Sequence, residues 1–124
     1  MGRGADAMID AVNDVLARWD AGEEPDRTAV KAAVKASLAV LVAAAPGHAV
    51  EVRIPPYAAV QAVEGSRHRR GTPPAVVECD ARTWLELAAG RVAWADSVAD
   101  GRVRASGERS DLSPYLPLET LKGP

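Results

Sequence analysis

The sequence predicts an α+β fold, and three observations in chain order lead to this prediction. Two stretches near the start repeat apolar residues at helical spacing. After Gly47 the pattern changes to the alternation of a half-buried strand. Further on, two short helical stretches precede one more alternating stretch, residues 103–106. A chain of 124 residues has room for one core, so we expect a single domain with a helical hairpin (1–46), a sheet with core helices (48–118) and a tail (119–124).

The first two helices are predicted from the spacing of their apolar residues. In residues 5–19 these fall on one face of an amphipathic helix, at Met8, Ile9, Val12, Val15, Leu16 and Trp19. Residues 22–25 break this helix, and Asp26 is placed to cap the next one with a side-chain oxygen. The second stripe runs to Ala45, where Pro46-Gly47 ends it. We therefore expect a helical hairpin that packs over another layer.

Three strands are predicted between the hairpin and the next helices. Apolar and charged residues alternate in residues 50–54, so one face of that strand is expected to be buried. Pro55-Pro56 cannot donate backbone hydrogen bonds and interrupts the ladder. Small and β-branched residues resume a strand in residues 57–63, and a third strand is expected at residues 75–79.

Residues 80–107 predict two short helices followed by a fourth strand. Asp80 is placed to cap the first helix, and Gly90 suits the left-handed conformation that ends it. The second helix carries an apolar set, Trp94, Ala95, Val98 and Ala99. Val103 and Ala105 then alternate with arginines and predict a strand that stops at Gly107. The tryptophans of both helices, Trp84 and Trp94, are expected in the core.

Composition and charge exclude several classes of protein. Fifteen basic and seventeen acidic residues give a formal net charge of -2, so no global field draws the chain to nucleic acid or anionic lipid. A single cysteine excludes an internal disulfide, and two histidines are too few for a three-histidine metal site. Residues 38–45, the longest apolar run, are too few to span a bilayer. We expect a cytoplasmic protein with no cofactor, no metal, no nucleic-acid partner and no stable membrane insertion.

Two features of the chain could carry chemistry. Residues 66–74 form a loop by composition and hold the densest charge, with Arg67, Arg69 and Arg70 around His68. Guanidinium groups match phosphate or carboxylate oxygens, so this loop is either an anion site or a solvated surface loop. Cys79 follows an apolar run and has no neighbouring base, which favours a buried structural thiol over a nucleophile.

A set of residues in the second half of the chain carries a family resemblance. They are Asp80, Thr83-Trp84, Leu87-Ala88, Gly90-Arg91, Ala95, Gly101-Arg102-Val103 and Ser106-Gly107. In this order they resemble the sterol carrier protein 2 (SCP-2) family, and more closely its bacterial, actinobacterial branch of stand-alone sterol carrier family proteins. The upstream segments EVRIPPYAAVQ and RHRRGTPPAVVE also look like that branch, so the resemblance covers about residues 50–118. The lack of phenylalanine and the short C-terminal segment, with one brief helix opened by Ser113-Pro114, depart from typical sterol carriers.

The resemblance implies an SCP-2-like mixed, twisted sheet with helices covering one face, preceded by the helical hairpin. It also implies an apolar cavity between sheet and helices that holds a lipid or another hydrophobic molecule. The residues expected to line it, called the wall residues below, are Trp84, Leu87, Trp94, Val98 and Val103. The other possibility is that the protein's own side chains fill this space, because protein interiors pack closely.

The predicted function is non-enzymatic binding or transfer of a lipid or other hydrophobic small molecule, with no catalytic residue. The alternative is a protein-interaction or regulatory module, in one form a homodimer, whose Arg67–Arg70 loop binds an anionic group. An enzymatic interpretation needs Arg70, Glu78 and His68 to meet in space, which their spacing does not require. The same fold occurs fused to a metal-binding bundle in thiol-dependent isomerases, but the histidines of such a bundle are missing here.

Overall fold

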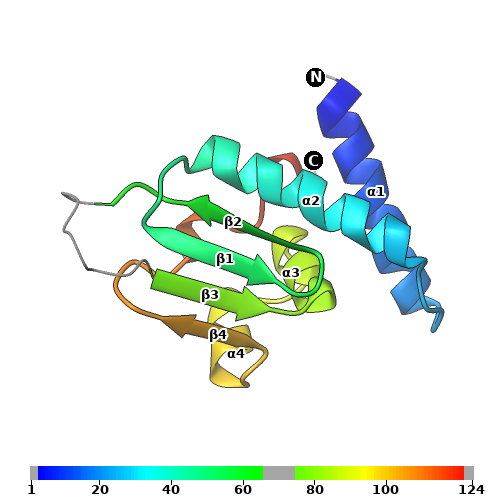
Figure 1. Cartoon of the computed structure of the whole chain (residues 1–124). Helices are drawn as coiled ribbons and strands as arrows, with labels where there is room; N and C mark the ends of the chain where they lie inside the picture. Colours follow the sequence, from blue (N-terminus) through cyan, green and yellow to red (C-terminus); the bar gives the residue numbers. More distant parts are fainter. Residues whose placement is uncertain (1–2, 66–74, 122–124) are drawn as a thin grey trace.

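The computed structural model describes residues 3–65 and 75–121, and it confirms the predicted α+β class (Figure 1). An N-terminal pair of helices precedes a mixed sheet and two further helices. In chain order the elements are α1 (Arg3–Asp20), α2 (Arg27–Ala44), β1 (Val50–Ile54), β2 (Ala58–Ala62), β3 (Ala75–Cys79), α3 (Ala81–Ala88), α4 (Trp94–Ala99), β4 (Val103–Ser106) and the short 3-10 helices η1 (Ser113–Tyr115) and η2 (Glu119–Leu121).

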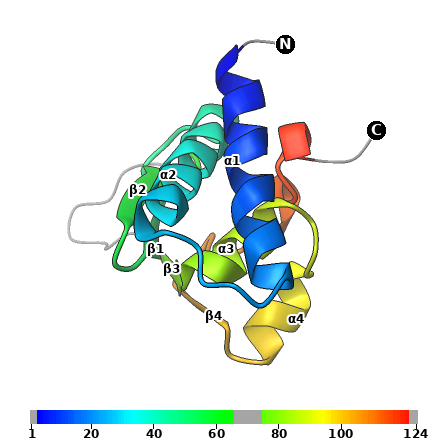
Figure 2. The ribbon, with the colours of Figure 1, turned by 90° about the vertical axis from the view of Figure 1, so that its right-hand side faces the viewer.

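The sheet has the strand order β2-β1-β3-β4. β1 pairs antiparallel with β2 and parallel with β3, and β3 pairs antiparallel with β4, so the sheet is mixed as predicted. The helices lie on one side of it: α3 and α4 are behind the sheet in Figure 1, and α2 packs on the β2 side. Figure 2, turned by 90°, shows α1 lying outside α2 and further from the sheet.

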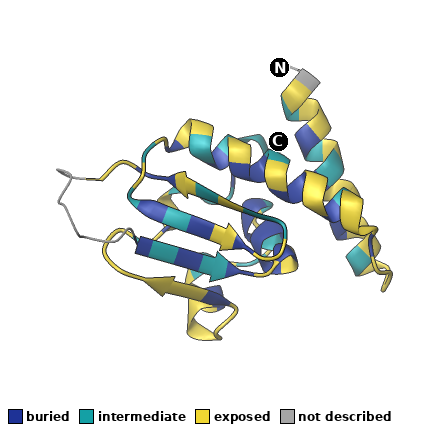
Figure 3. Cartoon of the chain, viewed as in Figure 1, coloured by how far each residue is buried: buried dark blue, intermediate teal, exposed yellow. Residues whose placement is uncertain are grey.

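The two faces of the sheet differ in polarity, as the alternating pattern predicts. In β1 the apolar residues are buried, whereas Glu51 is half-buried and Arg53 exposed, so this strand alternates in burial along its length (Figure 3). Arg53, Glu78 and Arg104 stand in register across β1, β3 and β4 on one face of the sheet, here called the open face. Arg104 pairs with Glu78 there, so opposite charges lie side by side and the open face is a solvated, charge-balanced surface.

The core lies between the sheet and the helices. The stripe predicted for the first helix is buried on α1, chiefly at Met8, Val12, Val15 and Leu16. On α3, the buried residues include Trp84, Leu85, Leu87 and Ala88. The buried face of α2 is made of Val30, Ala33, Val34, Ser37, Leu38 and Leu41.

The two predicted helix caps have different outcomes. Asp80 caps α3 as predicted, because its carboxylate accepts a hydrogen bond of 2.8 Å from the backbone N–H of Thr83. The side-chain cap predicted for Asp26 is wrong: within the described chain, its carboxylate makes no cap hydrogen bond to α2. Only its backbone carbonyl takes part, accepting from the N–H of Val30.

Candidate functional site

Most apolar side chains of helix α4 are exposed to solvent. Of its six described residues, Ser97 is the one that is buried, whereas Ala95 and Ala99 are exposed and Val98 is 39% exposed. Trp94 is half-buried. The core position predicted for Trp94 is therefore reached only in part, and the other apolar residues of the predicted helix, Ala95, Val98 and Ala99, are exposed. The physical reason is that α4 lies beside the edge strand β4, where no other element of the described residues covers its outer side (Figure 1).

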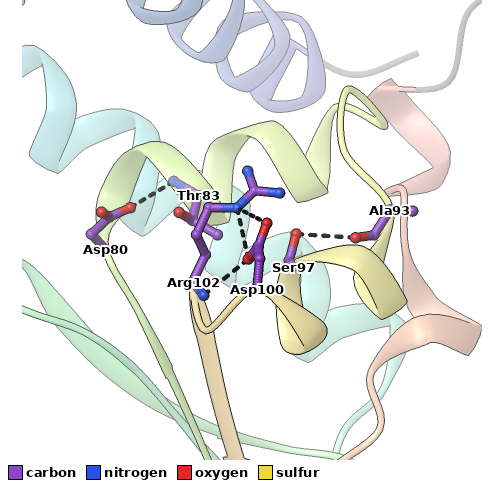
Figure 4. Close-up of polar contacts among 6 residues, drawn as sticks. All are labelled: Asp80, Thr83, Ala93, Ser97, Asp100 and Arg102. Carbon is purple, nitrogen blue, oxygen red and sulfur yellow. Dashed lines mark hydrogen bonds and ion pairs between the residues drawn. The ribbon is translucent and has the colours of Figure 1, made fainter.

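The polar contacts of α4 are local to the helix and its flanks (Figure 4). The hydroxyl of Ser97 donates to the carbonyl of Ala93 at 3.0 Å. At the other end, Arg102 donates to Asp100 from its Nε, at 2.9 Å to Oδ2 and 3.1 Å to Oδ1, and from its backbone N–H at 3.2 Å. These hydrogen bonds from Arg102 lower the pKa of Asp100, and Asp100 in turn raises the pKa of Arg102.

A hollow of about 550 Å³, here called the β4 hollow, lies between α4 and the edge of the sheet. Two wall residues line it, Val98 from α4 and Val103 from β4. Its lining mixes apolar and charged side chains because it reaches around the sheet edge. The other lining residues are Val76, Glu78, Gly101, Arg104, Ala105 and Ser106.

A second hollow of about 340 Å³, here called the Trp94 hollow, lies where the C-terminal segment meets the end of α3. It is lined by the wall residues Leu87 and Trp94, and its further lining is Gly90, Arg91, Val92, Ala93, Ser113, Leu116 and Pro117. The segment is held there by a backbone hydrogen bond of 2.9 Å from Leu118 to Ala88, and the side chain of Leu118 is buried. Arg91 at the rim donates from Nη1 to Asp20 of α1 at 2.6 Å.

Trp84, the remaining wall residue, lies in the core and lines neither of these two hollows. It is 1% exposed, and its indole Nε1 donates a hydrogen bond of 2.8 Å to the hydroxyl of Ser37 on α2. The hydroxyl of Ser37 in turn donates to the backbone carbonyls of Ala33 and Val34, one turn earlier in α2. The indole N–H of Trp84 thus has its hydrogen-bond partner inside the protein, and the ring fills the space between α3 and α2.

The structure therefore divides the wall residues between two hollows and the core. Sequence reasoning also missed Val92, Leu116 and Pro117, which line the Trp94 hollow. Gly90 is a sequence signal for the position of Pro117, because a Cβ at Gly90 would lie 3.2 Å from the ring of Pro117. The glycine therefore leaves room for the returning C-terminal segment. This role of Gly90 can be recognised only when the positions of α3 and of the C-terminal segment are known.

The arginine loop falls outside the described residues. Arg67, His68, Arg69 and Arg70 all belong to it, and the anion site predicted there stays a prediction. The same applies to the enzymatic interpretation that needs Arg70, His68 and Glu78 together. Glu78 itself lies on the open face of the sheet, paired with Arg104.

Cys79 is buried at the end of β3, as expected for a structural thiol. Burial, with smaller contributions from the charges of Asp80 and Glu78, raises the pKa of this thiol from 9.0 to about 12. A thiol that stays protonated at neutral pH is a poor nucleophile.

This shift predicts a pH dependence of stability. The thiol ionises near pH 9.0 in the unfolded chain but near pH 12 in the folded one, so its contribution is complete below pH 9 and is lost as pH rises towards 12. Between pH 9 and 11, we expect wild type to lose roughly 1.4 kcal/mol per pH unit relative to Cys79→Ala. Urea unfolding of both proteins at several pH values measures this difference, and parallel pH profiles would contradict it.

Two properties of the described residues concern metal binding and membrane crossing. Among residues 3–65 and 75–121, no group of three or more His, Cys, Asp or Glu side chains could hold a metal ion. In the same part of the chain, no helix has the length and apolarity needed to cross a membrane.

Comparison with known proteins places most of the chain in a described family. A family model with the description "Bacterial SCP ortholog" matches residues 26–118. The matched region contains α2, the sheet, α3, α4 and both hollows, and it leaves out α1. No curated protein matches the chain.

Proposed function

Because the chain belongs to a bacterial sterol carrier protein-like family, we propose that it binds a lipid or another hydrophobic small molecule and carries it without catalysing a reaction. The observation that carries this proposal is the Trp94 hollow. Its lining is mainly apolar, with Leu87, Val92, Trp94, Leu116 and Pro117 around it. It also lies within the region that matches the family.

The size and chemistry of the hollows support binding by apolar contact. Ligand pockets in proteins commonly measure about 300–1,000 Å³, and the hollows measure about 340 and 550 Å³. Burial of apolar surface contributes roughly 25 cal/mol per Å². Of the two, the Trp94 hollow is the better candidate for the apolar part of a ligand, because Glu78 and Arg104 line the β4 hollow.

The position of the proposed site differs from a cavity between the sheet and the main helices. That space holds Trp84 and the side chains of α2, including Leu38 and Leu41, which are 0% exposed. A ligand there would have to displace close-packed core residues, which is costly. We therefore place the site at the Trp94 hollow, next to the start of α4.

A tryptophan substitution tests this assignment. Trp94→Ala is expected to weaken the binding of cis-parinaric acid about tenfold or more, because a large apolar contact is lost. Fluorescence titration measures the dissociation constant. Trp19→Ala is the matched control, since Trp19 is also half-buried but lies on α1, stacked under Arg82.

The outcomes separate the site from the function. Equal affinities of the two variants would contradict the location at the Trp94 hollow. Absence of saturable binding by wild type, together with no apolar molecule in mass spectra of natively purified protein, would contradict the proposed function. The homodimer of the alternative interpretation stays a prediction, which light scattering on the same protein tests.

A further inference from the structure

Helix α4 borders both hollows, and it contributes one side chain to each from a single face, because its residues 94 and 98 are four positions apart. Trp94 at its start lines the Trp94 hollow, and Val98 in its last turn lines the β4 hollow. The strand beneath is only partly covered. Ala105 of β4 stands opposite Val77 of β3, so the two share the face that is turned towards the helices. Val77 is buried and Ala105 is exposed, so helix-side surface of the sheet next to α4 is left open.

The attachment of α4 to the rest of the protein is slight. Helix α3 has six buried residues among its eight, whereas α4 has Ser97 alone among its six. The Ser97 hydroxyl bonds within the helix and its flank, at Ala93. The Asp100–Arg102 contacts join near neighbours in sequence, and both side chains are exposed. Apart from the half-buried ring of Trp94, which packs against the core, displacing α4 would uncover little apolar surface and break few bonds to other described elements.

Both connections of α4 contain a glycine in the left-handed region. Gly90 has φ +78 and Gly101 has φ +83. Gly101 has open space around it, since no atom of the described residues lies within 4 Å of a Cβ built there. Glycine reaches many backbone conformations at little cost, so these two positions can absorb a change of direction of the helix between them.

We infer that α4 is a flap: it moves about Gly90 and Gly101, and the two hollows then join into one chamber that admits the ligand. The inference rests on the proposed function and adds the route by which the ligand enters. In the joined chamber Leu87, Trp94, Val98, Val103 and Ala105 would face the same apolar molecule. This would unite four of the wall residues that the closed structure keeps apart. A ligand that contacts both Trp94 and Val98 on the inner face of the flap binds the open form better and shifts the population towards it.

A reversible lock tests the flap. In a Cys79→Ala background, Val98→Cys and Ala105→Cys place one thiol on α4 and one on β4, both exposed and both at the β4 hollow. Bis-methanethiosulfonate linkers of graded length bridge the two thiols, and dithiothreitol releases them, so one protein is compared with itself. Locked protein is expected to bind cis-parinaric acid at least tenfold more weakly than the same protein after release. Ala105→Cys alone, carrying the linker at one end, controls for a linker that merely occupies the hollow.

The results distinguish the proposed movement of α4 from the proposed binding of an apolar ligand. Loss of affinity on locking, recovery on release, and a smaller effect in the single-cysteine control support the flap. Equal affinity of the locked and released forms overturns it while leaving the proposed function in place. An effect of the one-ended linker as large as that of the lock also overturns it. If the wild-type protein binds no probe and natively purified protein carries no apolar molecule, the proposed function fails and the flap fails with it.

Discussion

Replacing Trp84 by alanine is expected to lower the free energy of unfolding by about 3–5 kcal/mol. Trp84 is the largest of the fully buried side chains and is 1% exposed. The substitution leaves a cavity between α3 and α2 and removes the indole donor from the Ser37 hydroxyl. Urea unfolding followed by circular dichroism measures the loss.

Two further variants test why Trp84→Ala lowers the free energy of unfolding. Trp84→Phe keeps an aromatic ring and removes the N–H donor, so we expect an intermediate loss. Trp94→Ala removes a half-buried ring at a surface hollow and should destabilise clearly less than Trp84→Ala. Equal losses for Trp84→Ala and Trp94→Ala would contradict the assignment of Trp84 to the core and Trp94 to the hollow.

Replacing Gly47 by alanine is expected to cost about 2–6 kcal/mol of stability, because backbone strain and steric overlap add. Gly47 has φ +147, and a Cβ there would lie 2.3 Å from the carbonyl oxygen of Val63 and 2.6 Å from the backbone nitrogen of Glu64. Neither group can move freely. The N–H of Val63 donates to the carbonyl of Ala45, and the carbonyl of Val63 accepts from Ala49, so the end of β2 is fastened to the loop before β1.

Gly22→Ala is the matched control for this glycine. Gly22 also has a positive φ, +78, but a Cβ there meets nothing within 4 Å among the described residues. Only the left-handed conformation is then penalised, by about 1–2 kcal/mol. Thermal and urea unfolding of the two variants should separate them clearly. If both lose the same stability, the close approach at Gly47 is not the cause.

Folding and ligand binding are expected to depend on different tryptophans. The space between α2, α3 and the sheet is closed by Trp84 and its neighbours, so stability and binding should respond to different residues. Substitutions at Trp84 should act on folding, and substitutions at Trp94 should act on binding. A site next to the short helix α4 places binding where little of the core must be disturbed.

Much of the fold could be predicted from the sequence because its determinants are local. The α1 stripe at Met8, Val12, Val15 and Leu16 is set by helical spacing, and all of these residues are buried. The predicted strand at 57–63 is found as Ala58–Ala62, shortened at both ends. Tyr57 lies in the turn after β1, and Val63 has a positive φ. The first difference comes from a local turn, in which the N–H of Tyr57 donates to Ile54, and the second from the backbone bonds of Val63 to Ala45 and Ala49.

The candidate site was less predictable because a stripe on a helix does not reveal what covers it. Trp84 and Trp94 look equivalent in sequence, each opening an apolar stripe on a short helix. In the structure α2 covers the first through Ser37, while the second meets the returning segment at Leu116 and Pro117. The arginine loop, with Arg67, Arg69 and Arg70, lies outside the described residues, and its role stays a prediction.

The sequence by itself determined the α+β class, the order of the elements, the cap at Asp80 and the family resemblance. Each depends on residue type and spacing within a short stretch, or on their order along the chain. The tertiary structure alone decided that Trp94, unlike Trp84, borders a hollow, that α4 is barely buried, and that the C-terminal segment closes one side of that hollow. The physical reason is that burial belongs to pairs of surfaces from distant parts of the chain, and spacing along one element specifies only one surface of each pair.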